Sequence, residues 1–146
     1  YLFDTSTQAK RAKIAAFIEP TIRACSARGY AAVEIDNLDS FTRSHGATTL
    51  DDNVALASVY VRIAHRIGLA IAQKNTAEQS KRLAAAGFDF AVAESCVAYD
   101  ECEEYAGTYP VVLDVEYSDE IDASEFDAGC HRAGERVTVV LRDHIW

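Results

Sequence analysis

The sequence contains no methionine, only two prolines and one tryptophan, and it has no long hydrophobic run. Because no apolar stretch reaches the roughly 18 residues that a membrane-spanning helix needs, we expect no insertion into a bilayer. No signal-peptide pattern opens the sequence. The lack of methionine and the first residue, Tyr1, indicate a processed, trimmed or partial chain.

Positive charge is also scarce. The chain has 14 Lys and Arg residues against 23 Asp and Glu residues, which gives a formal net charge of −9. This balance disfavours binding to nucleic acid and to anionic lipid, because both present phosphate groups. Neutral or cationic ligands are therefore expected. The length of 146 residues, 49% of them hydrophobic, suits one domain with a core of its own.

The motifs of metal and nucleotide sites are missing as well. There is no Cys-x-x-Cys and no closely spaced pair of histidines, so the spacing of zinc ligands is absent. No glycine-rich loop follows any predicted strand, which disfavours an open sheet that binds nucleotides. The sequence therefore predicts no metal and no cofactor.

Four cysteines allow three pairings if all are oxidised. We expect a disulfide between Cys96 and Cys102, because they are close in sequence and flank a predicted loop. Four free buried thiols, with Cys25 and Cys130 among them, are the alternative. A disulfide favours an extracellular location, so secretion is expected.

Strands and helices are predicted to alternate along the chain. The predicted strands have little polar alternation, as expected for parallel strands covered on both faces, and span 1–5, 31–36, 69–74, 88–94, 110–117 and 136–142. The predicted helices span 7–28, 50–67, 77–86, 101–105 and 123–133. This alternation indicates an α/β protein with a parallel sheet.

Acidic residues at the ends of several strands favour a (β/α)8 TIM-type barrel over an open sheet, since such barrels carry their active sites at the carboxyl ends of the strands. A complete barrel needs about 250 residues. Six predicted strands are too few for it, and the chain is therefore expected to be the C-terminal portion of a barrel. We expect residues 1–146 to form a single domain that lacks about two strands at its N-terminus.

Three segments read as apolar strands that end in carboxylates: 33–39 (VEIDNLD), 90–96 (FAVAESC) and 111–117 (VVLDVEY). Hydrolysis of a glycosidic bond needs two carboxyl groups with different tasks, held on different strands so that they face each other across the sugar. Asp36 and Glu94 fit this requirement. The competing interpretation is that such acids only cap helices or lie in solvated loops.

These segments resemble one known family. Together with Lys74-Asn75 and Tyr99-Asp100-Glu101-Cys102, their order and intervals are similar to glycoside hydrolase family 114, the endo-α-1,4-polygalactosaminidases. The resemblance covers nearly the whole chain. It implies a retaining (β/α)8 glycosidase that cleaves α-1,4-linked galactosamine polymers, with Asp36 as the nucleophile and Glu94 as the general acid/base. Asp36 then has to be ionised, which Lys74 is placed to ensure, and Glu94 protonated.

The resemblance also implies an amino-sugar polysaccharide as the partner, and it assigns substrate-binding roles. The ammonium group of galactosamine is expected to meet Asp4, Asp39 or Glu116. The rings of Tyr99 and Tyr117 are candidates for stacking on sugar faces. The amides of Asn37 and Asn75 are candidates for hydrogen bonds to hydroxyl groups.

The sequence differs from the family pattern at two positions. Ala93 stands where an Asn usually precedes the catalytic Glu, and Gln73 stands where an apolar residue usually precedes Lys74. Three alternatives therefore stay open: a non-catalytic carbohydrate-binding protein or degenerate paralogue, a fragment completed by another chain, and a lyase or aldolase with a Schiff base on Lys74. The oligomeric state is not predicted.

Overall fold

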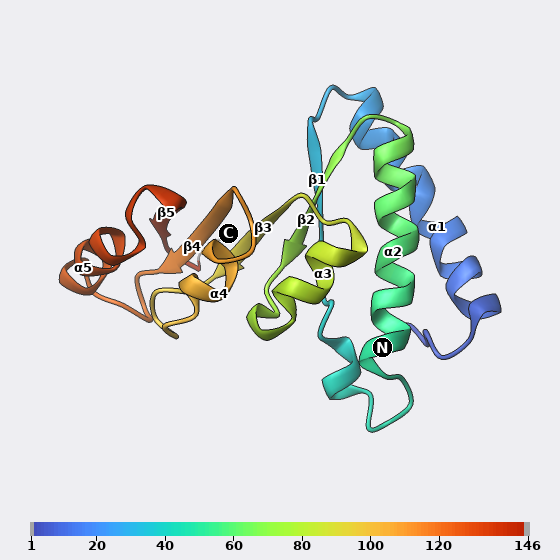
Figure 1. Ribbon diagram of the computed structural model, residues 1–146, viewed down its shortest axis with the longest axis horizontal. Helices are drawn as coiled ribbons and strands as arrows, with labels where there is room; N and C mark the ends of the chain where they lie inside the picture. Colours follow the sequence, from blue (N-terminus) through green and yellow to red (C-terminus); the bar gives the residue numbers. More distant parts are fainter. Residues whose placement is uncertain (1, 145–146) are drawn as a thin grey trace.

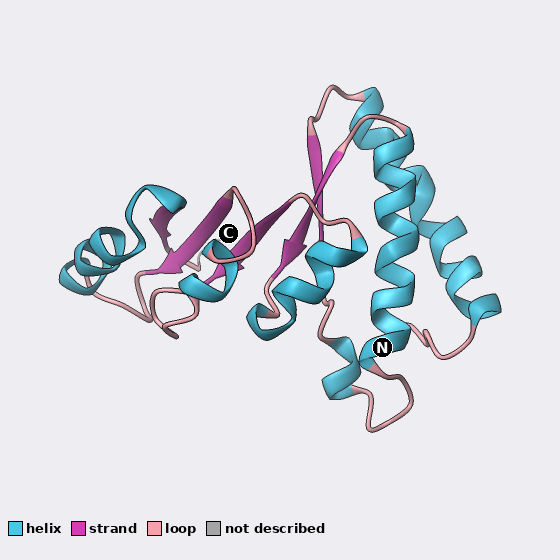
Figure 2. Ribbon diagram, in the orientation of Figure 1, coloured by secondary structure: helices cyan, strands magenta, loops and turns pink. Residues whose placement is uncertain are grey.

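A computed structural model describes residues 2–144 of the chain, and its centre is one parallel sheet of five strands (Figure 1). The strands are neighbours in the same order as in the sequence. They are β1 (Ala32–Ile35), β2 (Ala70–Lys74), β3 (Phe90–Glu94), β4 (Val112–Tyr117) and β5 (Val137–Arg142). A helix lies between each pair of successive strands (Figure 2), as the sequence predicts.

The helices are α1 (Gln8–Ala27), α2 (Leu50–Arg66), α3 (Ser80–Ala86), α4 (Cys102–Ala106) and α5 (Ala123–Ala133). Short 3-10 turns cover Ser40–Arg43, Ala77–Gln79 and Gly134–Arg136. Local sequence sets the helix starts. Thr49 with Asp52 and Asp122 with Glu125 form capping boxes that satisfy the free N–H groups of α2 and α5.

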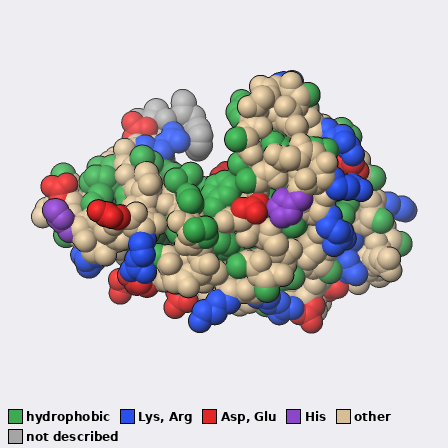
Figure 3. Space-filling model, turned by 45° about the horizontal axis from the view of Figure 1, so that its top comes forward, with side chains coloured by type: hydrophobic (Ala, Val, Ile, Leu, Met, Phe, Trp, Pro, Cys, Tyr) green, Lys and Arg blue, Asp and Glu red, His purple; other side chains and the backbone are tan. Residues whose placement is uncertain are grey.

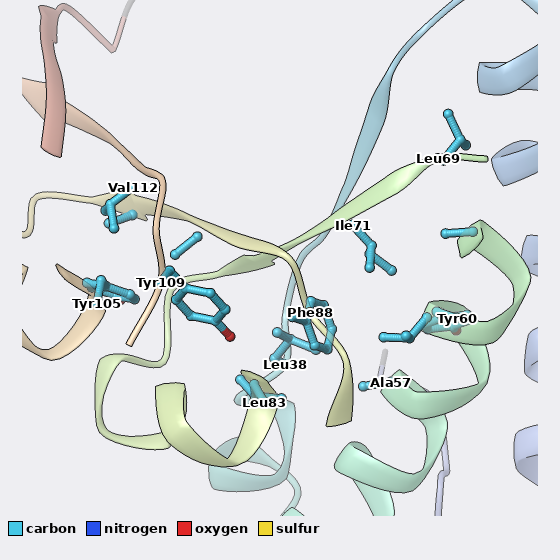
Figure 4. Close-up of a cluster of buried hydrophobic side chains, with 14 of the residues drawn as sticks. Leu38, Ala57, Tyr60, Leu69, Ile71, Leu83, Phe88, Tyr105, Tyr109 and Val112 are labelled. Carbon is cyan, nitrogen blue, oxygen red and sulfur yellow. The ribbon is translucent and has the colours of Figure 1, made fainter. Parts of the chain in front are cut away.

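The two faces of the sheet have different tasks, because successive side chains of a strand point to opposite faces. Ile71, Ala91 and Val112 point to the helices and are almost completely buried. In Figure 4, Ile71, Phe88 and Leu83 point toward one another between β2 and the helices α2 and α3. This side of the sheet therefore holds the hydrophobic core and fixes the strands that carry the site.

The opposite face is the inner face of a partial (β/α)8 barrel. Strands that are parallel, consecutive and joined by helices on one side are the arrangement of such a barrel, and the predicted fold class is confirmed. On this face Leu113 is 39% exposed and Val140 is 50% exposed. Figure 3 shows hydrophobic side chains around the hollow between the two ends of the molecule.

One predicted strand is wrong. Residues 2–5 form no strand and do not pair with the sheet, and Tyr1 lies outside the described residues. Polar contacts to helices hold this segment instead. Thr5 donates a hydrogen bond to Asn53, its carbonyl accepts one from Arg11, and Asp4 accepts one from the backbone of Ser6. The apolar pair Leu2 and Phe3 therefore precedes a helix start and does not extend the sheet. Within residues 2–144, no helix is both long and apolar enough to cross a membrane.

Candidate active site

Four side chains meet where the strands end, on the inner face of the sheet. Asp36 follows β1 directly, and Lys74, Glu94 and Tyr117 are the last residues of β2, β3 and β4. The register pairs Lys74 with Val92 and Glu94 with Val115, two residues before Glu94 and Tyr117 respectively. Because side chains two residues apart share a face, all three point to the same side.

Glu94 is the centre of this cluster, since donors reach both of its carboxylate oxygens. Lys74 Nζ lies 2.5 Å from Oε2, and the amide nitrogen of Asn75 lies 3.0 Å from the same oxygen. The hydroxyl of Tyr117 donates to Oε1 over 2.7 Å. The side chain of Glu94 is still 36% exposed, so a ligand can reach it.

These contacts decide the ionisation of Glu94. Partial burial alone raises the pKa of its carboxyl group, but the hydrogen bonds from Lys74, Tyr117 and Asn75 outweigh burial and lower the pKa to about 2. The pKa of Tyr117 is raised to about 12, chiefly because its hydroxyl donates to Glu94. Glu94 is therefore a carboxylate in the ligand-free chain, which differs from the protonated acid that the sequence predicts.

Lys74 also differs from its expected role. Its Nζ lies 3.9 Å from Oδ1 of Asp36, farther than from Glu94, so the closer partner is Glu94. Lys74 is only 8% exposed, whereas the side chain of Asp36 is 60% exposed. An ammonium held between two carboxylates also disfavours the Schiff-base alternative, because that reaction needs the neutral amine.

Both asparagines that follow the strands adopt left-handed backbone conformations, with φ of 59° at Asn37 and 53° at Asn75. Asparagine tolerates this region better than most residues. Asn75 accepts a hydrogen bond from the backbone N–H of Glu94 over 2.8 Å. Asn37 donates to Oδ2 of Asp36 over 3.0 Å. Each amide thus orients one carboxylate, which adds a positioning role to the predicted sugar contacts.

Four predicted substrate-binding residues take no part in the contacts around Glu94. Asp4 pairs with Lys10 and Ser6 at the start of α1, and these contacts lower the pKa of its carboxyl group to about 2. Asp39 pairs with Arg43. Tyr99 lies in the loop after β3 and is 65% exposed. The fourth residue, Glu116, points to the helix side.

Glu116 cannot bind a sugar in the hollow, because it is completely buried on the face opposite to Glu94. It accepts a hydrogen bond from the backbone N–H of Val97, and Asp114 accepts one from Cys96. The other oxygen of each acid receives no hydrogen bond from the rest of the described chain, and the two carboxyl groups contact each other. Burial, followed by the contact with Glu116, raises the pKa of Asp114 to about 8. The two acids therefore hold the start of the loop after Glu94.

A disulfide closes the same loop. Cys96 and Cys102 are bonded, as predicted, and Cys25 and Cys130 are free. Within residues 2–144, one group of three potential metal ligands is close enough to hold an ion, with one ligand atom each from Cys96, Cys102 and Asp114. The two sulfurs are bonded to each other, so they stabilise the loop as a disulfide and are not free to bind a metal ion.

The two departures from the family pattern both lie on the helix side. Ala93 is completely buried opposite Asp114, so it does not touch the cluster around Glu94. Gln73 donates to the carbonyl of Asn75 over 2.7 Å and accepts from the hydroxyl of Tyr109. Gln73 thus stabilises the turn that places Asn75 beside Glu94.

His144 was not selected from the sequence, yet its ring stacks on Tyr117 with a centroid distance of 3.7 Å. Nδ1 of His144 lies 2.7 Å from Asp119. The one available signal was position, because His144 follows β5 by two residues and so lies at the same edge of the sheet as the other strand ends.

Comparisons with known proteins identify a family and a similar fold. The model of glycoside-hydrolase family GH114 matches residues 1–145. A search among curated proteins finds no match. A solved structure, a crystal structure of Aspergillus fumigatus Ega3 in complex with galactosamine, is similar with a TM-score of 0.77 and 21% identity. The similarity covers 96% of this chain and 59% of that chain.

At this level of identity, the likeness to Ega3 shows a shared fold, and the present chain spans 59% of the length of that protein. The family match, in contrast, extends over almost every residue, including all four strand ends of the cluster. The chain belongs to glycoside-hydrolase family GH114.

Proposed function

We propose that this chain is a retaining glycoside hydrolase that cleaves α-1,4-linked galactosamine polymers, with Asp36 as the nucleophile and Glu94 as the general acid/base. Membership of a glycoside-hydrolase family supports the reaction class. The observation that carries the proposal is the position of Asp36 and Glu94 on either side of one ammonium group, that of Lys74.

This shared contact limits the separation of the two carboxylates. Since both distances start at Nζ, Oδ1 of Asp36 and Oε2 of Glu94 are at most 2.5 Å plus 3.9 Å apart, which is about 6.4 Å. Retaining enzymes hold their carboxyl groups about 5–5.5 Å apart, and inverting enzymes about 6.5–9.5 Å apart. This upper limit lies just below the range of inverting enzymes, so the contacts are compatible with retention.

In the proposed reaction Asp36 attacks the anomeric carbon, and Glu94 donates a proton to the glycosidic oxygen as that bond breaks. Water then attacks the anomeric carbon of the resulting glycosyl ester, the bond from that carbon to Asp36 breaks and frees the carboxylate, and Glu94 takes the proton of that water. Exposure of Asp36 leaves its carboxylate open to the sugar. Tyr117 and Asn75 keep the Glu94 side chain in place during both steps.

An amino-sugar polysaccharide is the proposed substrate. The similar Ega3 structure contains galactosamine, and the net charge of −9 is favourable for a polymer that carries ammonium groups. We also propose an extracellular location, which the disulfide between Cys96 and Cys102 supports.

The test is the release of reducing ends from an α-1,4-galactosamine polymer by the parent, Asp36→Asn and Glu94→Gln. The matched controls are Asp127→Asn and Glu135→Gln, which change exposed acids on α5 and on the 3-10 turn after it. The parent and controls are expected to cleave. Each active-site variant should lose about a thousandfold in rate while remaining folded. A folded parent that binds the polymer without cleaving it would support the carbohydrate-binding alternative.

The separate roles are tested by azide. An Asp36→Ala variant is expected to regain activity with azide and to form the β-glycosyl azide, because azide attacks from the vacated side of the nucleophile. The Glu94→Ala variant is given a substrate whose leaving group departs without a proton, because the general acid is missing. It should form the normal ester with Asp36 and then the α-glycosyl azide. The opposite pattern of products would exchange the two roles.

A further inference from the structure

The position of Lys74 between two carboxylates has a consequence for the order of proton transfers. We propose that Lys74 is a positioning residue whose ammonium moves from Glu94 to Asp36 when Glu94 takes up its proton, and returns when Asp36 becomes an ester. This inference rests on the proposed function, because the two carboxylates are the proposed catalytic pair.

The movement that this requires is small. Nζ already lies 3.9 Å from Oδ1 of Asp36. A charge-assisted hydrogen bond has a length of about 2.8 Å, so a shift of about 1 Å completes the second ion pair. Lys74 ends β2, and Asp36 follows the neighbouring strand β1, so no intervening strand separates them.

Burial gives the movement its direction. Lys74 is 8% exposed, and a buried ammonium without a negative partner is strongly disfavoured. When Glu94 is protonated, Asp36 is the remaining carboxylate in contact distance. The ammonium then stabilises the charge of the nucleophile at the step in which Asp36 attacks.

The contacts also select the oxygen that receives the proton. Tyr117 donates to Oε1, whereas Lys74 and the amide of Asn75 both donate to Oε2. Departure of Lys74 frees one of the two positions on Oε2 while Asn75 stays bound, and at this freed position the oxygen takes the proton that is passed to the glycosidic oxygen. Tyr117 retains its own bond throughout, because its raised pKa of about 12 keeps the hydroxyl protonated.

The return step follows from the same charges. Once Asp36 has formed the ester it is neutral, and Glu94, having given up its proton, is again the charged partner. Lys74 then moves back to Glu94 and keeps it deprotonated, which is the state needed to accept a proton from water. One ammonium thus accompanies whichever carboxylate carries the negative charge.

Two isosteric variants reproduce these states without substrate. Glu94→Gln mimics the protonated acid, and Asp36→Asn mimics the neutral ester. In crystal structures of the ligand-free chain, Nζ of Lys74 is expected within about 3 Å of Asp36 in Glu94→Gln. In Asp36→Asn it should remain on Glu94. An ammonium that stays on the amide oxygen introduced by Glu94→Gln, with Asp36 as distant as before, overturns the proposal.

A solution measurement covers the case in which Glu94→Gln does not crystallise. The thermal stabilities of Lys74→Met, Asp36→Asn and the double variant give the coupling between Lys74 and Asp36. This coupling should be larger when the same variants also carry Glu94→Gln than in the parent, and equal coupling in both backgrounds overturns the proposal. In kinetics, Lys74→Met should lower kcat at least tenfold with little change in KM. A parent that fails to cleave polymer overturns the proposed function, while the crystal structures still decide whether the ammonium moves.

Discussion

The hydroxyl of Tyr117, the last residue of β4, donates a 2.7 Å hydrogen bond to Oε1 of Glu94, the last residue of β3. The pairing of Glu94 with Val115 places Tyr117 two residues further along the neighbouring strand, on the same face. The bond fixes one carboxylate oxygen and turns the other toward Lys74. Two strand ends therefore create the asymmetry on which the proposed acid/base role depends.

Removal of this hydroxyl tests the asymmetry. Tyr117→Phe should raise the pKa of Glu94 above its value of about 2, because a donor that favours the ionised form is lost. A hydrogen bond to a charged group contributes about 1.5–3 kcal/mol, so the rise should be about 1–2 pKa units. Carbon NMR of labelled glutamate carboxyl groups during an acid titration measures it.

The matched control is Tyr99→Phe, which removes a hydroxyl from an exposed ring in the loop after β3. It should leave the titration of Glu94 unchanged. If Tyr117→Phe also leaves it unchanged, the hydroxyl of Tyr117 does not act on Glu94 in solution.

Acid should weaken the fold partly through Glu94. Its folded-state pKa of about 2 lies below the ordinary 4.5, so its ionisation adds stability that is fully present above pH 4.5 and is lost as the pH falls through about 2. The parent should therefore lose more unfolding free energy than Glu94→Gln between pH 6 and pH 2.5, as measured by urea unfolding at both values. Equal losses would show that Glu94 has no favourable pairing in the folded state.

Asp114 should have the opposite effect at higher pH. Its pKa is raised from 3.8 to about 8 by burial and by contact with Glu116. A carboxyl group with a raised pKa adds stability at low pH that is lost as the pH rises through the folded-state pKa. The parent should thus become less stable between pH 4 and pH 8, relative to Asp114→Asn.

Asn is a suitable replacement, because its side-chain oxygen can still accept the backbone N–H of Cys96 and its amide group can donate to Glu116. Urea unfolding of both proteins at pH 4.5 and pH 8.5 measures the difference. A gap between parent and variant that does not change with pH would show that this buried pair holds no proton.

The disulfide should contribute only modest stability, because the loop that it closes is short. Cys96 and Cys102 are separated by 6 positions, for which the chain-entropy relation gives about 2 kcal/mol. The variant with Ala at both positions should unfold with that much less free energy. The variant with Ala in place of Cys25 and Cys130, which are free, is the control.

Thiol labelling of the unfolded chain checks the same bond directly. Two thiols should react before reduction and four after it, because two of the four cysteines are bonded. Four reactive thiols without reductant would contradict the disulfide and support the alternative of four free cysteines.

The strands from β1 to β5 and the helices were predictable, because apolar runs, caps and glycines agree along the chain. The segment 2–5 was not, since its apolar pair gives no sign of the polar contacts made by Thr5 and Asp4. Apolar runs ending in acids identified the strand ends but not the face that each acid uses. Glu116 was therefore assigned to the wrong side of the sheet, although it lies on β4 beside Tyr117.

Electrostatic partners were harder to predict than positions. The sequence analysis placed Lys74 beside Asp36, whereas its closer partner is Glu94. A choice between Nζ–oxygen distances of 3.9 Å and 2.5 Å needs three-dimensional geometry. His144 shows the same limit, because its stacking on Tyr117 depends on the course of the chain after β5.

The stereochemistry of the first product tests the central claim most directly. Proton NMR is recorded immediately after the parent cleaves an α-1,4-galactosamine oligomer, before the new reducing end equilibrates between its anomers. A retaining enzyme with Asp36 as the nucleophile releases the α-anomer first. Initial release of the β-anomer would show inversion and contradict the assignment of Asp36 and Glu94 as a nucleophile and acid/base pair.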